Sequence, residues 1–120
     1  MALVSCIMPT CNRPHFVQKG IENFLRQDYA DKELIIVVDK ESDLPDIKTP
    51  DNIRAFVLNP TYSLGNKRNY ATYKAQGELI VMLDDDDLYA PDYLSKCVET
   101  IGDNDITGTN QLYFYQQPDK

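Results

Sequence analysis

The sequence lacks the long apolar segments that mark membrane-spanning and secreted chains. Its densest apolar run, residues 34–38, has the length of one β-strand, whereas a membrane-spanning helix needs about 20 apolar residues. No basic stretch followed by a long apolar stretch opens the chain, so we expect neither a signal peptide nor a transmembrane segment. Cysteine is also scarce, and Cys6, Cys11 and Cys97 form no C-x-x-C pair of the kind that binds zinc. Three widely spaced cysteines fit reduced thiols, so we expect a cytoplasmic location.

Basic residues are outnumbered, with 12 Lys and Arg against 19 Asp and Glu and a net charge of -7. This balance argues against nucleic acid as the main partner, because binding a phosphate backbone needs a basic face. It leaves room for a single nucleotide, which a metal ion and a few hydrogen-bond donors can hold. A chain of 120 residues with 42% apolar composition corresponds to one domain with its own core.

Glycine is absent from the segment PTCNRP, residues 9–14, which follows the first apolar run. This excludes a G-x-G-x-x-G dinucleotide site, and no P-loop occurs elsewhere. A calcium loop starting at Asp84 fails because its sixth position is Tyr89 and its twelfth is Ser95. A phosphorelay receiver domain needs an acidic pair after the first strand, where this chain has residues 8–11, MPTC.

Apolar runs and helical periodicity alternate along the chain. Ser63 can cap a helix with Gly77 just past its end, and Pro91 can open another helix. This alternation predicts an α/β fold with three layers, α/β/α and Rossmann-like, around a mainly parallel central sheet. We expect strands at 3–8, 33–38, 54–58 and 78–83, helices at 14–27, 64–75 and 91–102, a loop with a short helix across 43–52, and short strands at 105–107 and 112–115.

An acidic cluster, Asp84 to Asp87, stands directly after an apolar run in the stretch VMLDDDDLY. Residues 10–12 and Asp39 also follow predicted strands, so all three groups are expected at the carboxyl edge of the sheet. The cluster can be a solvated acidic loop. Its position favours a divalent cation instead, because unpaired carboxylates beside a buried strand are costly and hard oxygen ligands suit Mg²⁺ or Mn²⁺.

Three segments in order carry a resemblance: VSCIMPTCNRPHFVQKGIENFLRQDY, ELIIVVD and GNKRNYATYKAQGELIVMLDDDDLYAPDYL. Together they resemble the N-terminal, nucleotide-sugar-binding half of a family 2 glycosyltransferase with the GT-A fold, over most of residues 3–101. The resemblance implies metal-dependent transfer of a sugar, with inversion, from a nucleotide diphosphate-sugar to an acceptor hydroxyl. The donor would be UDP-linked, and the acceptor an unknown glycan, lipid or protein.

The resemblance also implies roles for residues outside the acidic cluster. Asp39 would accept a hydrogen bond from the base, typically from uracil N3–H. Arg68 would reach the base or the diphosphate, and the neighbouring Lys67 could substitute for it. The segment directly after the first strand would lie against the base and the ribose; it consists of Pro9, Thr10, Cys11 and Asn12.

Within the acidic cluster, the resemblance places the D-x-D motif at Asp84 and Asp86. Asp86 would contact the Mn²⁺ or Mg²⁺ ion directly. Four consecutive acids leave the register open, so Asp84 and Asp85 are both candidates for the ribose and for supporting the metal. The cation would offset the repulsion between these carboxylates and the diphosphate.

An inverting transferase needs a general base, and no convincing candidate follows Asp87. We therefore expect a single donor-binding domain, residues 1–120, that lacks the acceptor-binding half. A homo-oligomer or an additional chain could complete the acceptor site. The alternatives to an enzyme of this kind are a donor- or metal-binding module without independent catalysis and a nucleotidyltransferase of related fold. The latter is disfavoured because PTCNRP is not a glycine-rich basic loop.

Overall fold

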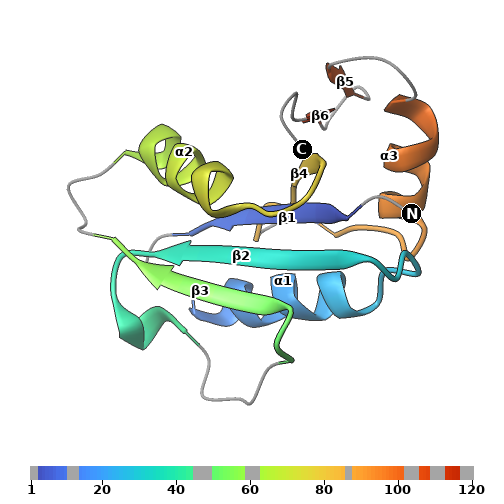
Figure 1. The fold of residues 1–120 in the computed structure, drawn as a ribbon. Coiled ribbons are helices and arrows are strands. Elements are labelled where there is room, and N and C mark those ends of the chain that lie inside the picture. Colours follow the sequence, from blue (N-terminus) through green and yellow to red (C-terminus); the bar gives the residue numbers. More distant parts are fainter. Residues whose placement is uncertain are drawn as a thin grey trace.

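A mixed β-sheet forms the centre of the protein (Figure 1). The structure is a computed structural model that describes residues 3–10, 14–44, 50–58, 63–85, 88–101, 106–108 and 113–116. The strand order is β3-β2-β1-β4-β6-β5, in which β3, β2, β1 and β4 are parallel and β6 and β5 are antiparallel to their neighbours. The strands are β1 (Val4–Pro9), β2 (Lys32–Val38), β3 (Ile53–Val57), β4 (Leu79–Met82), β5 (Ile106–Gly108) and β6 (Tyr113–Gln116).

Strand β1 lies between β2 and β4, with Cys6 paired to Leu34 on one side and to Val81 on the other. All six residues of β1 are buried, as expected for a central parallel strand covered on both faces. Strand β3 has only one partner among the described strands, and its residues alternate between more and less buried positions.

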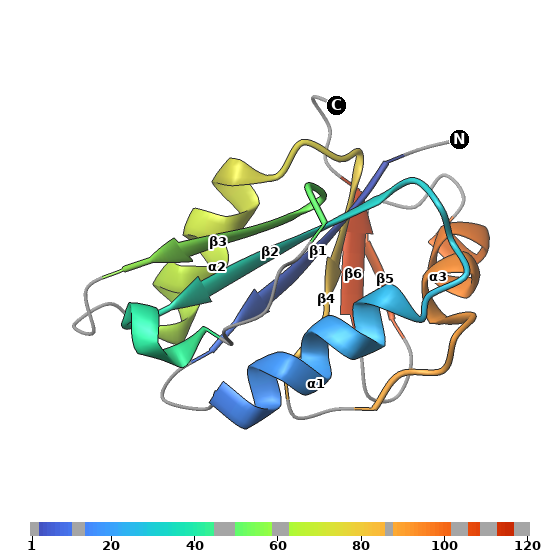
Figure 2. The ribbon, with the colours of Figure 1, turned by 90° about the horizontal axis from the view of Figure 1, so that it is seen from below.

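Helices cover both faces of the sheet (Figures 1 and 2). Helices α1 (Pro14–Leu25) and α3 (Tyr93–Ile101) pack against the larger apolar cluster, which includes Met8, Phe24 and Leu94. Helix α2 (Leu64–Lys74) covers the opposite face through a smaller cluster that includes Ile7 and Ala71. The expected α/β class with three layers and a mainly parallel sheet is thereby confirmed.

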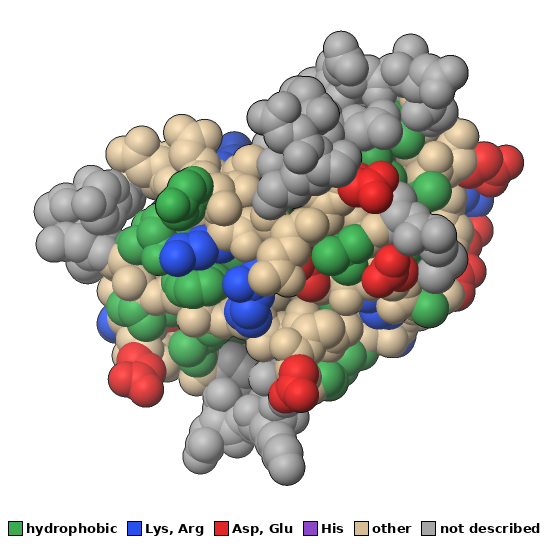
Figure 3. All heavy atoms as spheres, in the orientation of Figure 1, with side chains coloured by type: hydrophobic (Ala, Val, Ile, Leu, Met, Phe, Trp, Pro, Cys, Tyr) green, Lys and Arg blue, Asp and Glu red, His purple; other side chains and the backbone are tan. Residues whose placement is uncertain are grey.

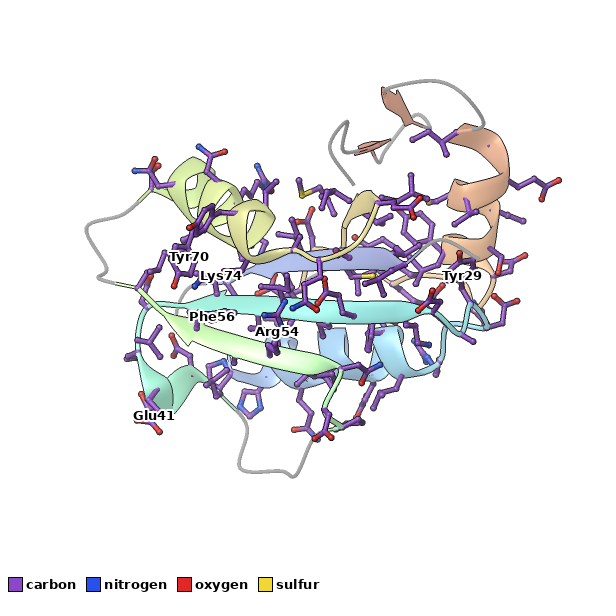
Figure 4. The ribbon with its side chains drawn as sticks, viewed as in Figure 1. Tyr29, Glu41, Arg54, Phe56, Tyr70 and Lys74 are labelled. Atoms are coloured by element: carbon purple, nitrogen blue, oxygen red, sulfur yellow. The ribbon has the colours of Figure 1, made fainter. Side chains whose placement is uncertain are left out.

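Helix α2 begins at the predicted cap, where the Ser63 hydroxyl accepts a hydrogen bond of 3.1 Å from the Asn66 backbone N–H. At its other end, the rings of Tyr70 and Phe56 make an edge-to-face contact with 5.6 Å between centroids. The Lys74 ammonium lies 5.5 Å from the Phe56 centroid, which joins the helix to β3 (Figure 4).

The start of one helix differs from its expected position. Helix α3 begins at Tyr93 rather than at Pro91, because residues 91–92 form a turn. A 3-10 turn, η1 (Glu41–Asp43), stands at the start of the expected 43–52 loop, of which residues 45–49 lie outside the described residues. Gly77 lies just past the end of α2, as expected, because Ala75 is the C-cap; a Cβ on Gly77 would lie 2.5 Å from the Leu3 carbonyl oxygen.

The order of the strands reverses at β1. The chain adds β2 and β3 on one side of β1 and then places β4 on the other side. In open α/β sheets, the crevice outside the carboxyl ends of two such strands is the usual ligand site. On the face shown in Figure 3, acidic side chains occur at several separate places. No helix among the described residues has the length and apolar character to cross a membrane.

Candidate functional site

Polar residues converge at the carboxyl ends of β1, β2 and β4. Thr10 follows β1, Asp39 follows β2, and Asp84 and Asp85 are the second and third residues after the end of β4. Thr10 and Asp85 are buried, Asp39 is largely buried, and Asp84 is half-buried. The amino-terminal half of α2 completes the group with Lys67 and Arg68.

Lys67 of α2 connects two of the strand ends. Its ammonium forms an ion pair with the Asp39 carboxylate and donates a hydrogen bond of 3.2 Å to the Thr10 carbonyl oxygen. Both side chains are nearly excluded from solvent, with 4% of Lys67 and 11% of Asp39 exposed. An isolated buried charge would be very costly, so each of these groups depends on the other.

Thr10 also bridges β1 to β4. Its hydroxyl donates a hydrogen bond of 2.5 Å to the carboxylate of Asp85, which is 6% exposed. Asp85 borders a surface hollow of about 410 Å³, lined otherwise by side chains of α1, by Arg26 and by Leu88. The hydrogen bond therefore ties the residue after β1 to the segment after β4 where the strand order reverses.

The Asp84 side chain has a different partner from that of Asp85. Its carboxylate lies 3.8 Å from the guanidinium of Arg68, the residue after Lys67 on α2. The side chains of Arg68 and Asp84 are 39% and 33% exposed, so this pair is more accessible to solvent than Lys67 and Asp39. The Asp84 backbone N–H donates a hydrogen bond of 2.9 Å to the hydroxyl oxygen of Tyr89, which holds the turn after β4 in place.

The residues predicted from the sequence thus fall into two groups. The structure brings Thr10, Asp39, Arg68, Asp84 and Asp85 to one edge of the sheet, beside Pro9 at the end of β1. Cys11, Asn12 and Asp86 lie outside the described residues.

Lys67 is the residue whose importance the sequence conceals. From the sequence alone it is only a substitute for Arg68, because lysines are rarely buried. A signal is nevertheless present: Lys67 and Arg68 stand near the amino end of a helix whose first turn has no acidic residue. Positive charge is unfavourable at that end of a helix dipole, so helix stability does not explain these two residues.

A divalent metal fits the donor set in part. The described residues contain no group of three or more acidic, His or Cys side chains arranged to hold a metal ion. Asp84 does supply a partly exposed carboxylate, which is a hard oxygen ligand of the kind that Mg²⁺ and Mn²⁺ prefer. A complete set would require further ligands, such as Asp86 or phosphate oxygens of a ligand.

Relatives of known sequence match nearly the whole chain. A Haemophilus influenzae protein described as an uncharacterized glycosyltransferase is 32% identical over 96% of this chain and 48% of its own length. The Escherichia coli UDP-Glc:alpha-D-GlcNAc-diphosphoundecaprenol beta-1,3-glucosyltransferase WfgD is 33% identical over 88% of this chain and 43% of its length. The chain thus spans about half or less of these relatives.

Solved structures share the fold. The Pyrobaculum calidifontis mannosyltransferase PcManGT, in complex with GDP-Man and Mn²⁺, has a TM-score of 0.75 at 17% identity over 96% of this chain and 44% of its own. S. aureus TarS in complex with UDP-GlcNAc has a TM-score of 0.69 at 21% identity over 91% of this chain and 36% of its own. The family model for glycosyl transferase family 2 matches residues 5–119. The chain therefore belongs to glycosyl transferase family 2.

Proposed function

We propose that the chain forms the donor-binding part of a metal-dependent glycosyltransferase that uses a UDP-linked sugar. The observation that carries the proposal is the shared edge of Asp39, Arg68 and Asp84 at the reversal of the strand order. A nucleotide diphosphate-sugar presents a base to be read and two phosphates to be neutralised, and this edge offers groups for both. The UDP-Glc named for WfgD and the UDP-GlcNAc bound to TarS support a uridine donor.

The base and ribose would occupy the side of the crevice nearer β2. Asp39 is an acceptor at the end of β2 and is suited to the N3–H of uracil. Pro9, Thr10, Cys11 and Asn12 would form the surface beneath the base and the ribose. Asp39 and Lys67 are nearly excluded from solvent, which strengthens each hydrogen bond made there.

The diphosphate would lie nearer β4. Arg68 is about two-fifths exposed, and its buried Nε has no hydrogen-bond partner among the described residues, so its guanidinium retains donors for phosphate oxygens. Asp84 and Asp86 would hold Mn²⁺ or Mg²⁺. A divalent cation bound there would screen the negative charge that develops on the leaving diphosphate. The Mn²⁺ in the PcManGT complex supports a divalent metal in this role.

The environments of Asp84 and Asp85 favour different roles for these neighbours. Asp85 is buried and accepts the Thr10 hydroxyl proton, so we assign it to holding the loop after β1 in place. Asp84 is more exposed and faces Arg68, so we assign it to the ribose and the metal.

The proposal includes transfer of the sugar to an acceptor hydroxyl with inversion at the sugar carbon. Inverting transfer requires a general base, and the described carboxylates of this edge are already assigned to the donor and to the loop. The name of WfgD includes a diphosphoundecaprenol-linked sugar, which supports a lipid-linked glycan as the acceptor. The alternative is a donor-binding module without its own catalysis.

Calorimetric titration with UDP in the presence of Mn²⁺ tests the site. The Asp84→Asn variant should bind UDP roughly 10- to 100-fold more weakly, the loss expected for one charged hydrogen-bonding partner. Asp92→Asn is the matched control, because Asp92 pairs with Lys96 by α3, away from this edge. Equal affinities of the native chain and Asp84→Asn, or no dependence on Mn²⁺, would contradict the assignment.

A second measurement separates an enzyme from a binding module. UDP-Glc and UDP-GlcNAc are incubated with the chain and Mn²⁺, with and without a lipid-linked glycan acceptor, and released UDP and transferred sugar are both measured. Transfer supports the complete activity. Donor binding with neither hydrolysis nor transfer supports the module.

A further inference from the structure

Lys67 has an environment that helix stability does not explain. It is the fourth residue of α2, near the helix end where the dipole disfavours positive charge, and it is 3% exposed. Residues that break a local rule at a cost to stability are common at functional sites. Its neighbours, the Asp39 carboxylate and the Thr10 carbonyl oxygen, both lie at strand ends that face the crevice.

The ammonium of Lys67 retains hydrogen-bonding capacity. A lysine has three N–H donors, and within the described residues Lys67 uses one toward Asp39 and one toward Thr10. One N–H donor therefore remains beyond the two contacts found within the described residues. Asp39 contributes a carboxylate, whose two oxygens offer about four acceptor positions in all.

We propose that Lys67 is a specificity-determining residue that reads the nucleotide base together with Asp39. The pair presents an acceptor beside a donor, and the complementary base edge has an N–H beside a carbonyl oxygen. Uracil and thymine provide N3–H beside O4, and guanine provides N1–H beside O6. This inference rests on the proposed nucleotide-sugar donor and adds a second reader of its base.

The same arrangement disfavours cytosine and adenine. In cytosine the N3 position is an acceptor and N4 is a donor, so each would meet a group of its own kind when the ribose and diphosphate fix the register. The cytosine N3 lone pair would face the Asp39 carboxylate, and the N4–H groups would face the Lys67 ammonium. Adenine has the same order, with N1 as acceptor and N6 as donor.

A purely structural role for Lys67 predicts a different outcome. Neutralising Asp39 and binding the Thr10 carbonyl oxygen would stabilise the fold and affect every nucleotide equally. The ratio of affinities for two nucleotides separates these roles. The diphosphate and the metal are common to all of them and cancel in that ratio.

Calorimetry in Mn²⁺ with UDP, dTDP, GDP, CDP and ADP provides the test. The native chain should bind UDP roughly 10- to 100-fold more tightly than CDP, the discrimination expected from one good paired contact. Lys67→Met should bring this ratio below about fivefold, and Lys67→Arg should restore it by returning a charged donor. Lys74→Met is the control, because Lys74 contacts Phe56 at the opposite end of α2, and it should leave the ratio unchanged.

Lys67→Met removes the ammonium that pairs with the largely buried Asp39 carboxylate, and this variant can fail to fold. In that case Asp39→Asn is compared with the double variant Asp39→Asn and Lys67→Met, which differ only at Lys67. An amide can turn either its carbonyl or its NH₂ to the base, so the preference for UDP should survive in the single variant and vanish in the double.

Two results would overturn the proposal, and they are distinguishable. Equal affinity of the native chain for UDP and CDP, or a ratio that survives the loss of Lys67, would remove its role in specificity while leaving the donor site intact. Failure of all five nucleotides to bind would remove the donor site as well.

Discussion

Cys97 shows how burial controls chemistry at a single residue. It lies in α3 against the larger apolar cluster and is 2% exposed. Burial raises the pKa of its thiol to about 11, although a hydrogen bond with Tyr93 acts in the opposite direction. Burial raises the pKa of Cys6 further still. Both thiols therefore stay protonated in the folded protein where free thiols ionise.

The raised pKa of Cys97 predicts a dependence of stability on pH. Above about pH 8.5 the unfolded chain loses thiol protons that the folded chain keeps, so the unfolded state binds fewer protons. The free energy of unfolding should therefore fall as the pH rises from 8.5 toward 11. Urea unfolding at several pH values should show a shallower fall for Cys97→Ala than for the native chain. Identical slopes would contradict the assigned cause.

The candidate site was predictable one residue at a time but not pair by pair. Asp39 and Asp84 could be placed because each follows an apolar run that is visible in the sequence. The ion pair between Lys67 and Asp39 joins residues 28 positions apart, and no local pattern specifies such a partner. The different burial of Asp84 and Asp85 depends on how the turn after β4 is held, which the run of four acids does not reveal.

Among the structural elements, the connection from α2 to β4 is held by close backbone and hydrogen-bond contacts. The Gly77 backbone N–H donates a hydrogen bond of 2.8 Å to the Ser5 hydroxyl, and the Ser5 hydroxyl donates in turn to Glu33 at 2.5 Å. Glu33 also accepts from Arg54 at 2.9 Å, so one polar network links β1, β2 and β3 to this connection. The network lies toward the amino ends of the strands, away from the candidate site.

Substitution of Gly77 tests this close approach. In Gly77→Ala the new Cβ would lie 2.5 Å from both the Leu3 carbonyl oxygen and the Ser5 hydroxyl, so the backbone must shift. Overpacking of this kind should reduce the free energy of unfolding by about 1–3 kcal/mol, measured by urea denaturation.

Gly65→Ala is the matched control for Gly77→Ala. Gly65 is in α2, and the nearest atom to its Cβ would be the Ser63 hydroxyl oxygen at 3.8 Å. Because alanine favours a helix, this change should be neutral or should add up to about 1 kcal/mol. A loss at Gly65 equal to that at Gly77 would show that close packing is not the cause.

The cap of α2 supports a separate prediction. Ser63→Ala removes the acceptor for the Asn66 N–H and should cost about 1 kcal/mol of unfolding free energy, measured by urea denaturation. Ser63→Asp keeps an acceptor and adds a negative charge at the helix end that favours one, so it should retain the native stability. An equal loss in both variants would contradict the capping role.

The elements themselves were largely predictable, for a physical reason. Strands buried on both faces are continuous apolar runs. The capping residue Ser63 and the helical periodicity of α1 are also local features of the sequence. The start of α3 was not, because Pro91 is compatible with a turn as well as with a first helical turn. The role of Gly77 was also hidden, since its constraint comes from β1 rather than from the helix before it.

At the scale of the whole molecule, charge at the crevice is unbalanced. The sequence supplies Asp39 and the four acids from Asp84 to Asp87, against Lys67 and Arg68 near the amino end of α2. Without a metal, this excess should repel the diphosphate, so UDP should bind more weakly than uridine, and added salt should reduce the difference by screening. With Mn²⁺ the order should reverse, and a chelator should restore it. Calorimetry with both ligands, with and without Mn²⁺, measures the effect; UDP binding more tightly than uridine in a chelator would contradict it.

The reversal of the strand order also has a consequence for the unfolding of the chain. Strands β3-β2-β1 lie on one side of the reversal and β4-β6-β5 on the other; β1 and β4 pair directly, and the Thr10–Asp85 hydrogen bond adds a side-chain contact between the two sides. A nucleotide that contacts Asp39 at one side and Asp84 at the other would fasten the two parts together. At a ligand concentration of 100 times its dissociation constant, binding to the folded state alone adds about 2.7 kcal/mol. The bound donor would then stabilise the folded state, and the protein should resist heat and proteases best while its substrate is bound.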